Sequence, residues 1–228
     1  MWALIPLKPF RQAKTRLAPR LSDGMRHALA RSMAEGVMRA LLSAVQVDQV
    51  AVCTADGEAE MLARELGCRV LPECDPGGGL NEVVAMSAAR LAEMGAERLL
   101  VVHGDLPFLN AREIDMFCAH FLVDPMRLVA MTPDRHGDGT NMIAWSLRHP
   151  FRPRFGHGSF RLHQEEARDM GLIPLTCRLP GAAADLDTAE DLAWIEAEAR
   201  RRGRAGGPFP TLPARHFPGF GLQLKDAT

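Results

Sequence analysis

The 228-residue chain contains no tyrosine, and its five cysteines form no C-x-x-C pair. The absence of tyrosine excludes the reductases that depend on a tyrosine–lysine pair. An odd number of cysteines without paired spacing is typical neither of a disulfide framework nor of a zinc site. We therefore expect reduced, mostly buried thiols in a cytoplasmic protein. The cysteines are Cys53, Cys68, Cys74, Cys118 and Cys177.

Long apolar runs and an excess of charge are also lacking. No segment approaches the roughly 18 consecutive apolar residues of a membrane helix, and the apolar N-terminus lacks the leading positive charge of a signal peptide. We expect no membrane association. The formal net charge of −1 argues against non-specific nucleic-acid binding, which usually needs a basic domain.

Several catalytic motifs are missing as well. The chain has no G-x-S-x-G elbow of a serine hydrolase and no H-E-x-x-H zinc motif. It also has neither a P-loop nor the G-x-G-x-x-G fingerprint of dinucleotide-binding proteins. With 47% hydrophobic and 24% charged residues, the composition is that of an ordinary globular protein, and the length suits one domain with a substantial core.

Apolar runs and helical spacings alternate along the chain. The run RLLVV at residues 98–102 has no polar alternation, which is typical of a strand covered on both faces in a parallel sheet. The alternation predicts an α/β fold, with a Rossmann-like, mostly parallel mixed sheet flanked by helices. Two of the strands, RLVAM and NMIAW, follow each other across a short polar loop, and we expect them to pair antiparallel. The predicted strands are residues 2–7, 49–54, 68–71, 98–102, 127–131, 141–145 and 172–177.

The longest predicted helix follows the first strand, with Ser22 or Asp23 as its N-cap. Its apolar face comprises Met33, Val37, Ala40, Leu41 and Ala44. Further helices are predicted at residues 57–67, around Val84, Ala88 and Leu91, at 159–170 and at 188–201. After Gly203 the composition turns to glycine, proline and arginine. We expect one domain over residues 1–202 and a flexible tail over 203–228, with a clasp across a dimer partner as the alternative.

Polar residues gather where predicted strands end, and ligands of open parallel sheets bind beyond those ends. The first strand is followed by LKPFRQAKTRLAP, and the fourth strand is followed by Asp105. The basic stretch is either a solvated loop or a site for a polyanionic phosphate, and Asp105 either closes a turn or belongs to a site. The basic residues of the stretch are Lys8, Arg11, Lys14 and Arg16, and Arg20 follows directly after it.

Two more acidic residues precede the last helix. Thr188 and Asp191 resemble a capping box, so Asp187 or Thr188 could be a helix cap only. Asp185 is not needed for a cap, and two carboxylates two residues apart suit a hard cation such as Mg²⁺. Together with Asp105 they favour a metal site.

Three glycine-containing stretches are less specific. DPGGGLNEVV at residues 75–84 could offer backbone N–H groups to an anion, although a plain turn is the simpler interpretation. TPDRHGDGTNMI at 132–143 could be a hairpin loop. Ser159, after Gly156 and Gly158, is either an N-cap or part of an anion site at a helix start.

In this order the stretches resemble the 2-phospho-L-lactate guanylyltransferase family of coenzyme F-420 biosynthesis, which uses a nucleotidyltransferase fold. The resemblance spans residues 1 to about 197. The wider superfamily usually ends its first strand in a Gly-Gly loop, whereas this chain has Lys8 and Pro9, as the F-420 branch does. The matching stretches are LKPFRQAKTRLAP, GGLNEVV, VVHGDLPFL, GDGTNMI, FGHGSFRLHQEEA and DLDTAEDL.

The resemblance implies a nucleotide site. Lys8, Lys14 and Arg16 would bind the GTP phosphates, and Asn81 would contact the nucleoside. Lys14, Arg16 and Asp105 would be the catalytic residues. Transfer of GMP to the acceptor would release pyrophosphate.

The resemblance also implies a metal and an acceptor. Asp105, Asp185 and Asp187 would hold Mg²⁺. The acceptor would be a small phosphorylated carboxylic acid, with phosphoenolpyruvate expected and 3-phospho-D-glycerate or 2-phospho-L-lactate as alternatives. The residues implied to bind this acid are Thr140, Gly156 and Ser159.

Other interpretations stay open at this point. A molybdenum-cofactor-type or sugar-phosphate nucleotidyltransferase would share the fold, and a non-catalytic nucleotide-binding subunit would share the binding site. The expected product is labile, which favours direct handover to a downstream deazaflavin phosphotransferase. Monomer and homodimer remain equally open.

Overall fold

A computed structural model describes residues 1–72 and 79–204 of the chain. Its centre is a seven-stranded sheet with the order β3-β2-β1-β4-β6-β5-β7. The predicted α/β fold with a mostly parallel mixed sheet is confirmed. Cys74, most of the glycine-rich loop (75–78) and residues 205–228 lie outside the described residues, so the tail and the boundary at residue 202 stay predictions.

The strands run parallel except for one. β1 (Trp2–Leu7) lies between β2 (Gln49–Thr54) and β4 (Arg98–Val102), and β3 (Arg69–Pro72) and β7 (Ile173–Thr176) form the two edges. β6 (Thr140–Ser146) is antiparallel to both β4 and β5 (Leu128–Pro133). The antiparallel pair expected from RLVAM and NMIAW is therefore confirmed. β4 sits at the centre and is buried from Leu99 to Val102, which explains its uniformly apolar sequence.

Helices cover both faces of the sheet. α1 (Asp23–Leu42), α2 (Gly57–Glu65) and α4 (Ala111–Leu122) contribute to the core on one face. α3 (Leu80–Glu93) and α5 (Ser159–Asp169) contribute to the core on the other face. The result is a three-layer arrangement with two apolar cores separated by the sheet.

The ends of the longest helix follow from its sequence. The Ser22 hydroxyl accepts a hydrogen bond from the N–H of Met25 at 3.3 Å, so Ser22, and not Asp23, is the N-cap. Met33, Val37 and Leu41 are buried as predicted. Ala44 is also buried but lies beyond the helix, whose last residue is Leu42.

Helix α4 is the element that the sequence analysis missed. Asn110 caps it by accepting from the N–H of Glu113 at 3.1 Å. Its buried side chains, at spacings of three and four, are Ile114, Phe117, Cys118 and Phe121. Both signals stand in the sequence, so the pattern was sufficient to predict this helix.

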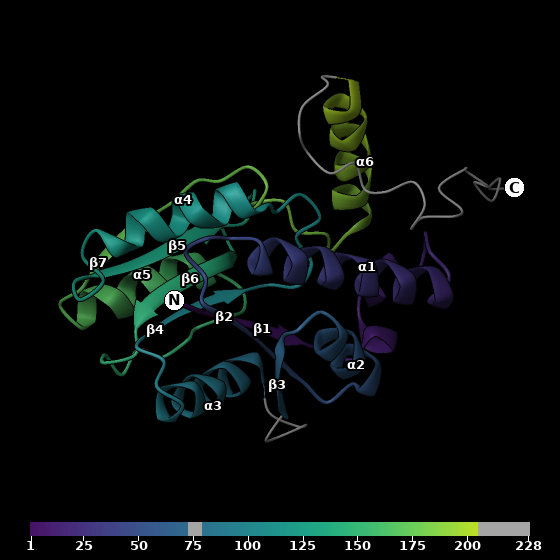
Figure 1. Ribbon diagram of the computed structural model, residues 1–228. Coiled ribbons are helices and arrows are strands. Elements are labelled where there is room, and N and C mark those ends of the chain that lie inside the picture. Colours follow the sequence, from purple (N-terminus) through teal and green to yellow (C-terminus); the bar gives the residue numbers. More distant parts are fainter. Residues whose placement is uncertain (73–78, 205–228) are drawn as a thin grey trace, which may run out of the picture.

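The last helix, α6 (Ala189–Arg204), projects away from the sheet above the middle of α1 (Figure 1). Leu192 and Ile195 of α6 pack with Leu29 and Met33 of α1 in a third, smaller core. This core also includes Leu186, and it therefore fixes the segment that carries the predicted acidic residues. Within the described residues, no helix is both long and apolar enough to cross a membrane.

Candidate active site

The basic stretch folds into two short turns directly after β1. A 3₁₀ turn at η1 (Phe10–Gln12) is followed by a second at η2 (Thr15–Leu17), and the buried side chains of Phe10 and Leu17 anchor them. Between them Lys14 has a φ of 56°, a left-handed conformation that costs a non-glycine residue free energy. From this position the Lys14 side chain contacts the segment after β4 and the segment before α6.

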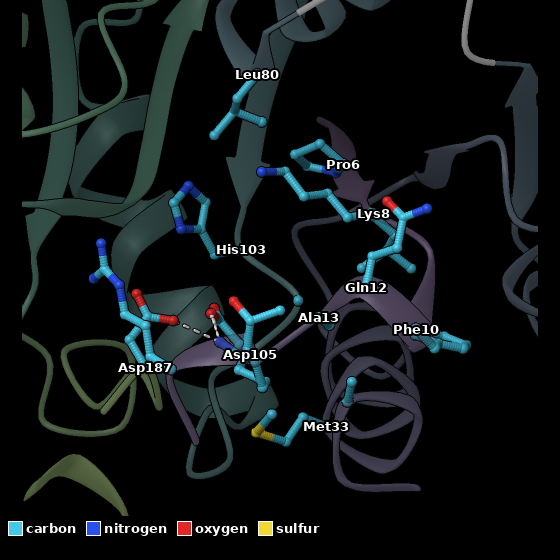
Figure 2. A pocket seen from close by; sticks show the side chains of 16 residues that line it. Pro6, Lys8, Phe10, Gln12, Ala13, Met33, Leu80, His103, Asp105 and Asp187 are labelled. Atoms are coloured by element: carbon cyan, nitrogen blue, oxygen red, sulfur yellow. Dashed lines mark hydrogen bonds and ion pairs between the residues drawn. The ribbon is translucent and has the colours of Figure 1, made fainter. Parts of the chain in front are cut away.

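A cleft of about 360 Å³ lies at this edge of the sheet. Its walls come from the chain after β1, from the segment after β4, from Leu80 at the start of α3 and from Asp187 (Figure 2). Of the five basic residues in and directly after the stretch, Lys8, Lys14 and Arg16 line the cleft. Lys8 and Arg16 are exposed, and neither forms an ion pair within residues 1–72 and 79–204.

Lys14 joins the two acidic segments. Its ammonium donates to Asp105 Oδ2 at 2.5 Å and to Asp187 Oδ1 at 2.8 Å, and the two carboxylates converge on it (Figure 2). Burial alone would lower the pKa of Lys14, but the two carboxylates outweigh it and raise the pKa above its ordinary value. Burial acts to raise the pKa of Asp105, and the Lys14 ammonium outweighs it and holds the pKa below its ordinary value.

These carboxylates have the chemistry of a divalent-cation site. Asp105 Oδ1 is buried and has no hydrogen-bond partner within the described residues, so it could accept a ligand in addition to the Lys14 ammonium that Oδ2 contacts. Asp187 is half exposed, so it is accessible to a ligand arriving through the cleft. The described residues contain no preformed cluster of three or more acidic, histidine or cysteine ligands, and the Lys14 ammonium contacts both of these carboxylates.

Asp185 lies behind this pair and is not part of the cleft lining. Its Oδ1 accepts from the Asn141 amide at 3.1 Å. Burial raises the pKa of Asp185 to about 6, and the negative charges of Asp105 and Asp187 act in the same direction. Proximity to two other carboxylates is consistent with a shared cation, because a cation would relieve the repulsion among them.

The segment that carries Asp187 is held by a buried network. Asp191 Oδ2 accepts from the backbone N–H of Asp187 at 3.2 Å and from that of Thr188 at 2.8 Å. Asp191 Oδ1 accepts two hydrogen bonds from Arg135, at 2.6 and 3.1 Å. The capping box of Thr188 and Asp191 is therefore confirmed, and Thr188 and Asp191 leave the Asp187 carboxylate available to the cleft.

Asn81 is fully engaged with the backbone. Its amide nitrogen donates to the Phe155 carbonyl at 3.1 Å, and its Oδ1 accepts from the Phe155 N–H at 2.6 Å. Asn81 thus fastens the segment before Gly156 to the start of α3. It does not line the cleft, although its neighbour Leu80 does.

The residues expected to bind the acceptor form a second group, and none of them lines the cleft. Thr140 is the first residue of β6, Ser159 is the first residue of α5, and their hydroxyl oxygens are 3.5 Å apart. Both side chains are buried. The interpretation of Ser159 as the N-cap is wrong, because Gly158 occupies that position with a left-handed φ of 70° and Gly156 precedes it with a φ of 128°.

The sequence analysis did not predict two histidines of the site, because neither belongs to a metal-binding motif such as H-E-x-x-H. His103 lines the cleft, packs at a tilt against Phe155 with ring centroids 5.2 Å apart, and has a buried Nε2 without a partner in the described part of the chain. Burial lowers the pKa of His103. His163 lies deeper and contacts the ring of Phe155 edge-on at 4.9 Å. His103 could have been predicted from its position directly before Gly104 and Asp105. No feature of the sequence pointed to His163.

Comparison with known proteins identifies the fold and the family. The family described as "Guanylyl transferase CofC like" matches residues 1–198. The chain belongs to this family. A relative from Sphaerobacter thermophilus named phosphoenolpyruvate guanylyltransferase is 39% identical over 197 residues, which cover 86% of this chain and 93% of the relative. A relative from Conexibacter woesei with the same name is 37% identical over 206 residues, covering 90% and 91%.

Solved structures agree on the fold. A protein from Desulfovibrio desulfuricans G20 superposes with a TM-score of 0.71 at 18% identity, covering 90% of this chain and 88% of the other. A nucleotidyl transferase from Methanothermobacter thermautotroptrophicus gives 0.64 at 16% identity, covering 88% and 97%. The protein is a guanylyltransferase with a nucleotidyltransferase fold, and the predicted family and enzyme class are confirmed.

Proposed function

We propose that this enzyme transfers GMP from GTP to phosphoenolpyruvate and releases pyrophosphate, as a step of coenzyme F-420 biosynthesis. The observation that carries the proposal is the convergence of Lys14 with Asp105 and Asp187 at one cleft in a chain of the guanylyl transferase family. The relatives from Sphaerobacter and Conexibacter carry phosphoenolpyruvate guanylyltransferase as their name.

The cleft supplies positive charge where a triphosphate would need it. Lys8 and Arg16 are exposed at its wall, and both side chains can turn toward phosphate oxygens. Lys14 would exchange part of its contact with the carboxylates for contact with the nucleotide. These three residues would neutralise the triphosphate and the pyrophosphate that leaves.

The chemistry is an in-line displacement between two anions. A phosphate oxygen of the acceptor attacks the α-phosphorus of GTP, one new P–O bond forms, and the bond to the oxygen of the leaving pyrophosphate breaks. A phosphate monoester with a second pKa near ~6 is mostly dianionic at neutral pH, so no general base is required. The protein therefore contributes mainly positioning and charge neutralisation.

Asp105, Asp185 and Asp187 would hold Mg²⁺, which neutralises phosphate charge and orients the reacting groups when bound. The unpartnered oxygen of Asp105 and the accessible carboxylate of Asp187 support this assignment. Release of the Lys14 ammonium from these carboxylates would free their oxygens for the cation.

The acceptor would lie against the second group of residues. Thr140 and Ser159 would donate hydroxyl groups to the phospho-acid, and Gly156 would allow its close approach. Asn81 would contribute to the nucleoside site indirectly, because it holds the loop at Phe155 in place. We further propose a cytoplasmic enzyme whose labile product passes directly to the downstream deazaflavin phosphotransferase.

Pyrophosphate release tests the proposal. The protein is incubated with GTP and Mg²⁺ and, in parallel, with phosphoenolpyruvate, 3-phospho-D-glycerate or 2-phospho-L-lactate, in the presence of the downstream phosphotransferase and its deazaflavin acceptor. We expect release with phosphoenolpyruvate and GTP, and little release when CTP replaces GTP. Activity only with a sugar phosphate or a molybdopterin, or GTP binding without pyrophosphate release, would contradict the proposal.

A further inference from the structure

His163 is a fully buried histidine whose hydrogen bonds determine its tautomer. Its Nε2 lies 2.8 Å from the backbone nitrogen of Arg154, and its Nδ1 lies 3.0 Å from the hydroxyl oxygen of Thr140. A backbone N–H can only donate, so Nε2 must accept and cannot carry a proton. The ring proton of the neutral histidine is therefore on Nδ1.

The tautomer fixes the role of the Thr140 hydroxyl. Because Nδ1–H donates, the Thr140 oxygen accepts from His163, and the hydroxyl hydrogen of Thr140 remains available to another acceptor. The Ser159 hydroxyl also donates to the Thr140 oxygen, at 3.5 Å, the far limit of a hydrogen bond. Thr140 is buried, and its hydroxyl could donate a short hydrogen bond to an anion that reaches it.

The same ring also fixes the neighbouring loop. The Arg154 N–H that donates to His163 lies two residues before Gly156, and the Phe155 ring packs edge-on against the imidazole at 4.9 Å. Phe155 is in turn held by Asn81 through both of its backbone polar groups. One side chain thereby connects β6, α5 and the segment of residues 154–156.

We propose that His163 is a positioning residue for the acceptor phospho-acid, acting through its Nδ1–H on Thr140 so that the threonine hydroxyl donates to the carboxylate or phosphate of the acid. The proposal rests on the proposed function, because it takes the acceptor to bind at Thr140. Burial lowers the pKa of His163 to about 3, with His103 and then Arg154 acting in the same direction. The ring therefore stays neutral, and its donor does not change with pH in the physiological range.

Two substitutions separate the two hydrogen bonds of the ring. The side chain of His163→Asn can place an amide donor near the position of Nδ1, whereas that of His163→Gln reaches the position of Nε2 and can accept from Arg154 only. We expect His163→Gln to weaken phosphoenolpyruvate binding about 10-fold, as for the loss of one hydrogen bond, and His163→Asn to weaken it less. The affinity for GTP should stay within about twofold of wild type in both. His120→Gln, an exposed histidine on α4, is the matched control and should change neither affinity.

A double-mutant cycle tests whether the effect passes through Thr140. Phosphoenolpyruvate binding is measured by calorimetry with Mg²⁺ for wild type, His163→Gln, Thr140→Val and the double variant. If His163 acts on the acid through the hydroxyl, His163→Gln adds no further loss in the Thr140→Val background. Additive losses, or equal weakening of GTP and phosphoenolpyruvate binding, would overturn the proposal.

A spectroscopic measurement on the wild-type protein keeps the proposal testable if the variants fail to fold. Long-range ¹H–¹⁵N correlation spectra of the histidine rings should show His163 as the neutral Nδ1–H tautomer, with a shift on adding phosphoenolpyruvate and none with GTP alone. A protonated ring, the other tautomer, or no response to the acid would overturn the proposal. Binding of phosphoenolpyruvate without pyrophosphate release would instead contradict the proposed function and leave the role of His163 standing.

Discussion

At the residue scale, the site is centred on one ammonium group that contacts two carboxylates. Lys14 takes up a left-handed backbone conformation and is almost buried, and its ammonium contacts two carboxylates from distant segments. A buried cation in such a position is retained only with its partners. The free energy spent on this arrangement is consistent with a role in binding and catalysis.

Asp105→Asn tests the central carboxylate. The amide has the same shape but no charge, so we expect turnover to fall at least about 100-fold, a typical loss for one electrostatic group of a transition-state site. Pyrophosphate release measures this effect, and thermal unfolding should show that the fold is retained. Asp23→Asn is the control, because Asp23 is 95% exposed at the start of α1. Normal turnover in the Asp105 variant would remove this residue from the catalytic site.

At the element scale, most helix starts are set by a local side chain, and a few positions depend on close approach. Ser22 and Asn110 cap α1 and α4, and both contacts are local in sequence. Gly181 is different, because its backbone N–H donates to Glu113 of α4 at 2.8 Å, and a methyl group at Gly181 would collide with the Phe108 carbonyl oxygen. The sequence around Gly181 does not predict that contact.

Gly36→Ala should stabilise the protein. Gly36 lies exposed in the middle of α1, and an added Cβ meets no atom within 4 Å. Alanine loses less backbone entropy than glycine in a helix, so we expect the free energy of unfolding to rise by about 0.5–1 kcal/mol. Calorimetric unfolding would register this as an increase in Tm of about 1–4 °C.

Gly181→Ala should destabilise the protein, because the added methyl group would collide with the Phe108 carbonyl oxygen. The collision with a backbone oxygen cannot be relieved by a side-chain rotation, so we expect a loss of roughly 1–3 kcal/mol. A lower Tm for the Gly36 variant, or an unchanged Tm for the Gly181 variant, would show that the local environments differ from those described.

At the scale of the whole molecule, the sheet, the apolar cores on its two faces and the smaller core between α1 and α6 hold the site. Buried titratable groups make this fold sensitive to acid. His163 is central to this because it cannot be protonated without losing its bond to Arg154. Asp185 works in the opposite direction over the same range, since burial raises its pKa to about 6. The pH dependence of stability therefore has to be compared between variants.

The contribution of His163 should disappear in acid. The pKa of His163 in the folded protein is about 3, against an ordinary value of 6.5. Below pH ~6.5 the unfolded chain therefore binds a proton at this histidine, whereas the folded protein does not. The stabilisation is complete above that pH and is lost as the pH falls toward 3. Between pH 7.5 and 5 we expect the free energy of unfolding to fall about 2 kcal/mol more in wild type than in His163→Asn. Identical pH profiles in urea unfolding would contradict this.

The sequence by itself determined the sheet-and-helix alternation and the two parts of the site that follow strands. β4 could be placed because a strand buried on both faces must be apolar throughout, and Asp105 could be placed because it comes directly after that strand. The same local physics would have given α4, whose cap and apolar spacing are complete in the sequence. These features depend on neighbours within a few residues, which a sequence displays directly.

Only the tertiary structure decided which side chains meet. Lys14 lies 91 residues from Asp105 and 173 from Asp187, and the sequence could suggest their convergence at one sheet edge but not that the lysine would bridge the two carboxylates. The engagement of Asn81 with Phe155 and the fixed tautomer of His163 were beyond sequence reasoning altogether. Each depends on packing between segments far apart in the chain, and the direction of a buried hydrogen bond is set by the partner that the fold places opposite it.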